Sequence, residues 1–520
     1  MNLSVLRVVL LALGLSLPVS ATAQDAVARA VVEDAAAALG GPERIAALRT
    51  LRLRGYGHEA YQDGGSEITT EERAPEKTTN LSAYQREIDL ANGRTLVRAR
   101  LSRAFVFAAR GMMTGLPIAQ ALDGDIAFDL AADGSARRQA AATAQRRRME
   151  LLANPVMAVR TALAAGSSVS NRRDEAGLTL VDVRTAAGED FSLAVAADSK
   201  LPQWVRWVAP HENLGEVTLR AEFSAYAPVQ GLQLPMSYNT VSDFKDTVML
   251  RLHVDRYEVD AAIADLAAPA AVRDMPAPEP VFNVSSTEVA PGVTLLGGGG
   301  ANGILLEFAD HLTLFEVPTS RGWTAALIAK ARELVPGKPL TEAIISHHHF
   351  DHTGGLRTAV AEGLTIIAQQ GNLGWFESLL QRPVTHFPDA LSRNPQPLRL
   401  LGVDDHLRLS DAALTVDLYR VVANGHMAHG LLAYVPEHKL LIQGDLHDQN
   451  WETYFWGDTY EANLAHRGLD VERDVPVHGG VLPLDEVRTL IRQQTANAAA
   501  LCGEVAAAGL SMPGCPLAWE

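Results

Sequence analysis

The chain has little of three things that define whole classes of protein: cysteine, basic charge and long apolar runs. Only 2 of its 520 residues are cysteine, which excludes a disulfide-rich mini-protein. Its 45 basic residues are outnumbered by 61 acidic ones, for a net charge of −16, so no nucleic acid is expected as a partner, because a phosphate backbone requires a basic face. The length instead suits a globular protein of roughly two to four domains.

An apolar stretch of ten residues, 8–17, lies near the start of the chain. It is half the roughly 20 residues that a membrane-spanning helix needs, so no stable membrane anchor is expected. Arg7 precedes the stretch, and the small residues at 21 and 23 offer signal peptidase a cut before Gln24. We therefore expect residues 1–23 to be a signal peptide and the mature protein to be periplasmic or secreted.

Residues 24–266 are predicted to form a β-rich α+β domain. An alanine-rich helix is expected over 25–39 and a second helix over 144–165. Between and after these helices, short segments of alternating hydrophobicity predict antiparallel strands. The pairs Asn92-Gly93 and Asp133-Gly134 are hairpin signals between such segments.

The segment 267–280 contains four prolines and shows no periodicity, which predicts a linker. Beyond it, over residues 281–520, strands alternate with helices, a pattern typical of a layered α/β domain. The glycines at 297–300 lack the residues of a phosphate loop and are expected to form a hairpin turn. Cys502 and Cys515 are expected to pair in an oxidising compartment.

A run of histidine and aspartate follows an apolar strand of this second domain. The strand TEAIIS ends where the motif HHHFDHTGG begins. His347 and His349 are two residues apart on an extended segment and point to one side, whereas His348 points away. Asp351 and His352 follow after the chain turns and can face the same place. Imidazole and carboxylate are ligands for Zn²⁺, and the carboxyl ends of strands are where α/β sheets bind ligands.

The motif HHHFDHTGG resembles the HxHxDH motif of the metallo-β-lactamase superfamily, whose fold is an αββα sandwich. Three further elements follow in that family's order, namely NGH, the strand–turn–strand LLAYVPEHKLLIQGD and VHGG. The resemblance covers roughly residues 281–490 and implies a binuclear metal site with two Zn²⁺ per chain. The implied ligands are His347, His349 and His426 for one ion, Asp351, His352 and His478 for the other, and Asp445 as the bridge.

Such a site implies a hydrolase. Two Zn²⁺ ions that share one water lower its pKa from about 15.7 toward about 7, which supplies a metal-bridging hydroxide. Asp351 is the expected catalytic residue, because it can orient the nucleophile and carry its proton. The expected partner is a small-molecule substrate with an ester, lactone, thioester or amide bond. An alkylsulfatase- or β-lactamase-like hydrolase is the alternative.

Three positions leave alternatives open. His429 competes with His426 as a ligand, although the interval of nineteen residues between His426 and Asp445 favours His426. Four aromatic residues in 451–456 form either an apolar wall for a hydrophobic substrate or the core of a loop. Glu316 stands where many members of the family have Asp, which leaves its structural role open.

A non-enzymatic function is the second hypothesis. The number of strands in the first domain and the phrase GLQLPMSY resemble the half-barrels of periplasmic lipoprotein chaperones. That resemblance implies a periplasmic carrier of apolar ligands. The complete set of seven ligand positions favours the enzyme, because degenerate copies usually lose some of them.

Overall fold

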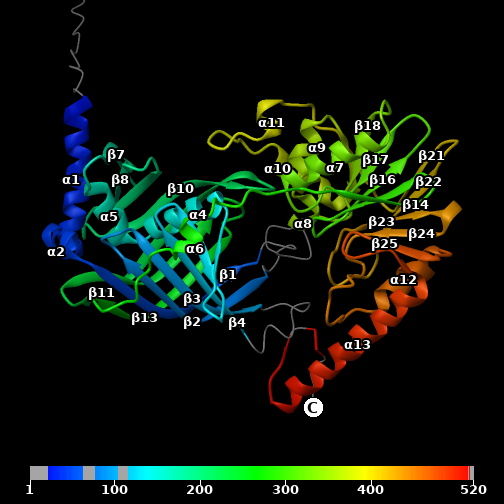
Figure 1. Ribbon diagram of the computed structural model, residues 1–520. Helices are drawn as coiled ribbons and strands as arrows, with labels where there is room; N and C mark the ends of the chain where they lie inside the picture. The colour runs from blue at the N-terminus through cyan, green and yellow to red at the C-terminus, as the bar shows by residue number, and fades with distance from the viewer. Residues whose placement is uncertain (1–20, 62–76, 104–114, 513, 516–520) are drawn as a thin grey trace, which may run out of the picture.

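The computed structural model describes residues 21–61, 77–103, 115–512 and 514–515. Most of the expected signal peptide, residues 1–20, therefore lies outside the described residues. The first described helix, α1 (Ala21–Leu39), begins four residues before the expected helix. Figure 1 shows two lobes side by side, with the first half of the chain on the left and the second half on the right. No helix among the described residues has the length and apolar character of a membrane span.

The first lobe is built on one large antiparallel sheet. Its order is β6-β5-β4-β3-β2-β1-β13-β12-β11-β10-β9-β8-β7, so the first and last strands of the lobe pair at its middle (Figure 1). The strands are β1 (Thr50–Ala60), β2 (Thr78–Asp89), β3 (Arg94–Arg103), β4 (Leu116–Asp123), β5 (Ile126–Leu130), β6 (Ala136–Arg138), β7 (Ser168–Glu175), β8 (Leu178–Arg184), β9 (Asp190–Ala196), β10 (Pro202–His211), β11 (Gly215–Val229), β12 (Leu232–Ser242) and β13 (Val248–Val259).

Helices cover this sheet and share its core. They are α1, α2 (Pro42–Ala47), α4 (Ala141–Leu152) and α5 (Pro155–Leu163). Val32 of α1 and Val156 of α5 are fully buried in one apolar cluster with Leu193 and Leu252 of the sheet. This burial of a sheet face against helices confirms the β-rich α+β prediction for the first half.

The hairpin signals are confirmed, whereas the single helix expected over 144–165 is wrong. The turn at Asn92-Gly93 joins β2 to β3, with Gly93 at φ +64°. In place of one helix, α4 ends at Leu152 and α5 begins at Pro155. Proline lacks the N–H that would continue α4, and the Asn154 side chain accepts hydrogen bonds from the first N–H groups of α5.

The segment expected to be a linker is partly folded. It contains the short helix α6 (Ala270–Arg273). Ala268 and Val272 are buried against Leu96 and Phe128 of the first lobe. Ala268 and Val272 therefore pack this connecting segment against the sheet of the first lobe.

The second lobe contains two further sheets. The seven-stranded sheet has the order β14 (Ser285–Ala290), β15 (Val293–Gly297), β16 (Gly303–Glu307), β17 (Leu312–Phe315), β18 (Leu340–Ile344), β19 (Thr365–Gln369) and β20 (Leu400–Val403). The six-stranded sheet has the order β21 (His406–Ser410), β22 (Thr415–Arg420), β23 (Leu431–Val435), β24 (Leu440–Gln443), β25 (Arg473–Pro476) and β26 (Leu482–Pro483). The expected glycine turn at 297–300 is confirmed, because it connects β15 to β16.

Helices flank the two sheets on their outer sides. They are α7 (Arg321–Leu334), α8 (Phe350–Thr353), α9 (Leu356–Ala361), α10 (Leu373–Leu380) and α11 (Ala390–Arg393) on the first sheet, and α12 (Asp458–Arg467) and α13 (Leu484–Ala507) on the second. Short 3-10 turns lie at η2 (Gln370–Asn372) and η3 (Pro436–His438). The alternation of strands with helices that the sequence predicted here is thus confirmed, with α7 after β17 and α9 after β18.

Three apolar clusters hold these layers together. Phe315 and Ile344 of the first sheet meet Leu418 and Ile442 of the second between the sheets. A second cluster lies under α7, α9 and α10, and a third lies under α12 and α13. The strands are therefore buried on both faces, as in other layered α/β folds. The second lobe has the predicted αββα arrangement.

The expected cysteine pair is confirmed. Cys502, near the end of α13, forms a disulfide with Cys515. The bond ties the segment after α13 to that helix, and Met512 packs there against Leu501 and Val505.

Candidate metal centre

All seven predicted ligands lie at one edge of the second lobe, where strands end. His347 and His349 follow β18, and Asp351 and His352 lie on α8, a short helix that the sequence did not reveal. The other three follow strands of the second sheet, β22, β24 and β25, which run in one direction and so end at the same edge. The structure brings the seven together as two groups, His347, His349, His426 and Asp445, and Asp351, His352, Asp445 and His478.

The first group is made of three histidines and one aspartate, all buried. His347 Nε2 lies 2.9 Å from His349 Nδ1. His426 Nε2 lies 2.9 Å from Asp445 Oδ2. Imidazole nitrogen and carboxylate oxygen atoms at this spacing could hold a metal ion, and both are donors that Zn²⁺ accepts.

The second group uses the other oxygen of Asp445. Asp445 Oδ1 lies 3.3 Å from His352 Nε2 and 3.4 Å from His478 Nε2. The two imidazole nitrogens are 3.3 Å apart, and Asp351 Oδ2 is 3.5 Å from His478 Nε2. Zn–N bonds of about 2.0–2.1 Å place tetrahedral ligands about 3.3 Å apart. The donor spacing therefore fits a metal ion in each group, with Asp445 facing both.

Buried groups behind the ligands fix their orientation. Glu316 Oε2 lies 2.9 Å from His352 Nδ1 and accepts a hydrogen bond of 2.6 Å from Ser346 Oγ. Glu316 Oε1 accepts the Ser346 N–H at 3.0 Å. A carboxylate on the far nitrogen of a ligand histidine sets its tautomer and ring direction. The open question about Glu316 is thereby answered, because it positions His352.

Two residues at the centre have left-handed backbone conformations. Glu316 has φ +81° and Asp445 has φ +62°. Such conformations cost roughly 1–3 kcal/mol for residues other than glycine and cluster at functional sites. Gly444, just before Asp445, has no room for a side chain, because a Cβ there would lie 2.2 Å from Ser346 Oγ.

The charges of the centre divide its histidines into two kinds. Burial lowers the pKa of His347 and His349 well below the usual value. Burial also opposes the charged form of His352 and His478, but nearby carboxylates, Asp445 foremost, raise the pKa of His352 well above its usual range and that of His478 to about 9. The carboxylates thus give the second group a stronger attraction for positive charge than the first.

The two competing histidines are separated by the structure. His426 belongs to the first group, whereas His429 belongs to neither. The ring of His429 lies against Gly371, where a Cβ would be 2.6 Å from Nδ1. His348 belongs to neither group and is buried, with its ring 5.5 Å from that of Trp375. A side chain that points away from the ligands could lie behind them or face solvent, and the structure shows the buried placement.

The aromatic segment 451–456 lies partly in the core of a loop and partly beside the first group of predicted ligands. Tyr454 is buried in the core under α12 and α13, and its hydroxyl donates to the carbonyl of Leu446. The rings of Trp451 and Trp456 are only partly buried and lie 5.5 and 6.3 Å from the ring of His426. Two tryptophans therefore form an apolar wall beside the first group.

Sequence reasoning missed two residues of the first lobe that approach the centre. Asn213 donates hydrogen bonds to the backbone of Phe350 and to Thr353, within the metal motif. Lys77, just before β2, has a buried Nζ, and its charge adds to the effect of burial in lowering the pKa of His349 and of His426. No local pattern marks either residue, because each lies more than a hundred residues from the motif.

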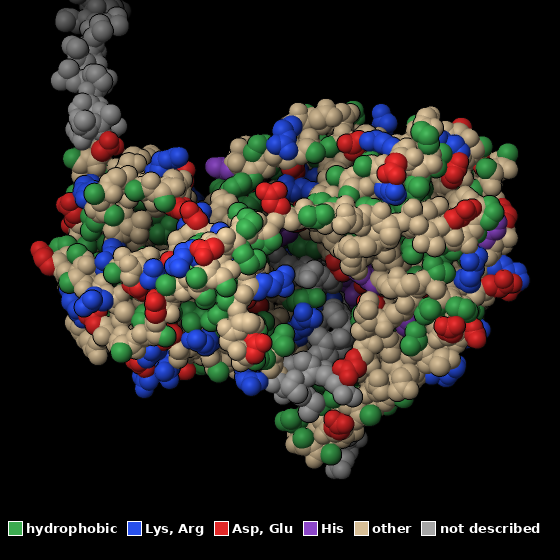
Figure 2. All heavy atoms as spheres, viewed as in Figure 1, with side chains coloured by type: hydrophobic (Ala, Val, Ile, Leu, Met, Phe, Trp, Pro, Cys, Tyr) green, Lys and Arg blue, Asp and Glu red, His purple; other side chains and the backbone are tan. Residues whose placement is uncertain are grey.

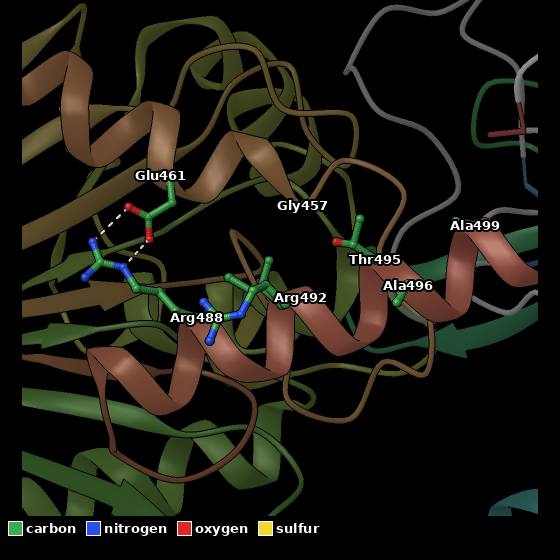
Figure 3. Close-up of a pocket in the computed structure, with 8 residues that line it drawn as sticks. Gly457, Glu461, Arg488, Arg492, Thr495, Ala496 and Ala499 are labelled. Carbon is green, nitrogen blue, oxygen red and sulfur yellow. Dashed lines mark hydrogen bonds and ion pairs between the residues drawn. The ribbon is translucent and has the colours of Figure 1, made fainter.

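The surface agrees with this placement. Figure 2 shows histidine side chains beside a hollow between the two lobes. A separate groove lies between α12 and α13 (Figure 3). Arg488 and Glu461 pair across that groove at 2.6 and 2.9 Å, and none of the seven predicted ligands lines it. The candidate active site is therefore the edge of the second lobe at which the seven predicted ligands meet, and not this groove.

Comparison with protein families points to the part of the chain that holds most of these residues. The family model described as the metallo-beta-lactamase superfamily matches residues 296–458. A metallo-beta-lactamase from Pontibacter korlensis is 14% identical, with 42% of this chain and 99% of that chain covered and a TM-score of 0.32. The stereoselective inverting sec-alkylsulfatase Pisa1 from Pseudomonas sp. is 18% identical, with 44% of this chain and 43% of that chain covered and a TM-score of 0.33. The second half of this chain thus contains a domain of the metallo-β-lactamase superfamily.

Proposed function

We propose that the protein is a zinc-dependent hydrolase that holds two Zn²⁺ per chain and cleaves an ester, lactone, thioester or amide bond of a small organic molecule. The observation that carries this proposal is the position of Asp445. Its two carboxylate oxygens face two separate groups of buried ligands, at 2.9 Å on one side and 3.3 Å on the other. A shared carboxylate is what a pair of neighbouring ions requires.

Bound Zn²⁺ would polarise the bond to be cleaved and lower the pKa of a water molecule toward about 7. The protein's own residues supply the proton handling and the orientation. Among the described residues, no donor contacts the buried Oδ1 of Asp351, so this oxygen can accept the proton of the attacking water and pass it to the leaving group. Glu316 holds the His352 ring in place, and Trp451 and Trp456 form an apolar surface for the substrate.

A second candidate, a hydrolase of anionic substrates such as sulfate esters or β-lactams, is favoured by Lys77. Its ammonium brings positive charge close to His349 and His426. The carrier hypothesis is less favoured, because α1, α4 and α5 already share the buried core of the large sheet.

Metal content and a substrate panel test the proposal together. The purified protein should contain about two equivalents of zinc and hydrolyse at least one member of a panel of chromogenic esters, lactones, β-lactams and sulfates. A chelator should abolish this activity and added zinc should restore it. Asp445→Asn is the matched variant, and it should lose both zinc and turnover. Protein that purifies without metal and gains no activity from added zinc would contradict the proposal.

We also propose that the protein is exported. The signal-like segment at 1–23 and the disulfide between Cys502 and Cys515 support this proposal, because stable disulfides form in oxidising compartments. Fractionation of the native host followed by N-terminal sequencing tests it. A periplasmic or secreted chain that begins at Gln24 is expected, and an uncut chain in the cytoplasm would refute export.

A further inference from the structure

The turn between β10 and β11 is the part of the first lobe that enters the second. Leu214 and Val217 are buried in the apolar cluster under α7, α9 and α10. Gly215, the first residue of β11, has φ +76°, and a Cβ there would lie 2.3 Å from Val384 of the second lobe. The close approach shows that the turn is fitted into the second lobe. Figure 1 shows the hairpin reaching across to α8 and α10.

One side chain of this turn binds the metal motif directly. Asn213 is 4% exposed, and its Nδ2 donates to the carbonyl oxygen of Phe350 and to Thr353 Oγ1, each at 2.9 Å. Thr353 Oγ1 in turn donates to the carbonyl oxygen of His349 at 2.9 Å. A single amide from the first lobe is thereby connected to the backbone just before Asp351 and to the side chain of Thr353 just after it.

Aromatic packing holds the same segment from the side. The ring of His211, at the end of β10, meets the ring of Phe350 at 5.3 Å. The ring of Phe244, after β12, lies 6.3 Å from Phe350, and Trp375 of α10 stacks on its other side at 5.8 Å. Phe350 stands between His349 and Asp351 in the motif, so its position fixes theirs.

We propose that Asn213 is a positioning residue of the metal centre, through which the first lobe sets the conformation of the segment 347–353. This inference rests on the proposed function, since it concerns the same ligands. The segment carries four of the seven ligands, and its turn is closed by few internal bonds, such as that from the His352 N–H to the His349 carbonyl at 3.0 Å. Replacing a residue that orients a metal ligand through a hydrogen bond commonly lowers metal affinity or activity about 10–100-fold.

Zinc affinity of the full chain is the first measurement. Asn213→Ala should weaken zinc binding about 10–100-fold in a chelator competition, and it should change the visible spectrum of the cobalt-substituted protein. Asn239→Ala is the matched control, because Asn239 Nδ2 also makes a hydrogen bond in this sheet, to Glu222 at 3.1 Å, but lies outside the turn. The control should keep wild-type affinity and spectrum. If both variants bind zinc and their zinc affinities are equal, the proposal is overturned.

A second variant guards against simple misfolding. Gly215→Val adds a side chain where it would meet Val384, and so separates the turn from the second lobe while leaving Asn213 in place. It should weaken zinc binding in the same direction as Asn213→Ala. The circular dichroism spectrum and the thermal unfolding of each variant should match those of Asn239→Ala. A variant that loses helix and strand signal together with zinc counts against a positioning role.

Hydrogen exchange of the metal-free chain separates this inference from the hydrolase proposal. In chelator-treated protein, Asn213→Ala should raise the exchange rate of the peptide that covers residues 347–355 about tenfold or more, with β22–β25 unchanged. That result is independent of whether the protein binds zinc or turns over any substrate. If the wild-type chain binds no zinc but the exchange result holds, the hydrolase proposal fails while the first lobe still positions this segment. Unchanged exchange would refute the positioning role.

Discussion

The two lobes contribute to the candidate site in opposite ways. The second lobe supplies all seven predicted ligands from the ends of buried strands and from α8, and a motif of nine residues marks most of them. The first lobe supplies no predicted ligand, but it contributes a buried asparagine and a lysine from two distant strand ends. Most of the predicted ligands thus stand together in one short motif of the sequence. The residues of the first lobe that are proposed to support the ligands or to select the substrate reach the site only because the two lobes pack together.

The largest expected effect tests the second lobe alone. His426→Ala should lose at least one zinc ion and more than about 100-fold in kcat/KM, because it removes a direct ligand rather than a supporting group. His429→Ala is the control, since His429 lies outside both groups. Zinc analysis and kinetics of the two variants measure the difference, and a larger loss for His429→Ala would show that the ligand was assigned to the wrong histidine.

The next effect concerns support from within the second lobe. Glu316→Gln should reduce zinc affinity or kcat about 10–100-fold, because the neutral amide orients His352 less firmly than the carboxylate. Glu342→Gln serves as the control, because Glu342 lies on the neighbouring strand β18 and pairs with Thr313 and His311 rather than with a predicted ligand. Chelator competition measures the change, and equal zinc affinity in both variants would remove Glu316 from the centre's support.

A smaller effect is expected from the charge that the first lobe contributes. Lys77→Met should lower kcat/KM about tenfold for an ester whose acyl chain ends in a carboxylate, and leave the corresponding methyl ester unchanged, because an ammonium group attracts only the anion. Lys200→Met, at an exposed turn of the same lobe, should change neither. The same comparison with an aryl sulfate distinguishes recognition of a carboxylate from recognition of a sulfate. If Lys77→Met lowers kcat/KM equally for the charged and the neutral ester, Lys77 does not select its substrate by charge.

The smallest effect concerns the stability of the contact between the lobes. Burial alone would raise the pKa of Glu216, but backbone N–H groups of His386, Thr385 and Phe387 lower it from 4.5 to about 2. A carboxyl with a lowered pKa stabilises the fold fully above about pH 4.5, and this contribution is lost as the pH falls toward 2. Glu216→Gln should therefore lower Tm by about 2–4 °C at pH 6.

Calorimetry at several pH values measures this difference. The gap between wild type and Glu216→Gln should narrow steadily between pH 4.5 and the lowest pH at which the protein stays folded. A difference in Tm that stays constant across this range would mean that the charge of Glu216 does not strengthen its hydrogen bonds with the N–H groups at 385–387.

The sequence predicted the elements that are determined by residues close to one another along the chain. The Asn92-Gly93 turn, the αββα arrangement and the seven converging positions each follow from short patterns and one resemblance. The single helix expected over 144–165 is wrong because Pro155 begins a second helix, α5, behind the cap residue Asn154. The helix α8 was missed because four residues within a metal motif show no periodicity.

The remaining features depend on contacts that no short pattern encodes. Asn213 and Phe350 are separated by 137 residues, and their hydrogen bond exists only because the two lobes pack together. The role of Glu316 likewise required the position of Ser346 on a neighbouring strand end. Composition could only predict that such polar groups, if buried, would be paired.

The place of the turn 211–217 in the chain has a consequence for biogenesis. Domains generally fold in the order in which they are made, and this turn is synthesised more than a hundred residues ahead of His347. The receiving surface for the motif HHHFDHTGG is therefore already shaped when those histidines emerge. On the proposed function, zinc capture would be a late event in maturation, because the five histidines and two aspartates that would hold the metal come together only in the folded chain.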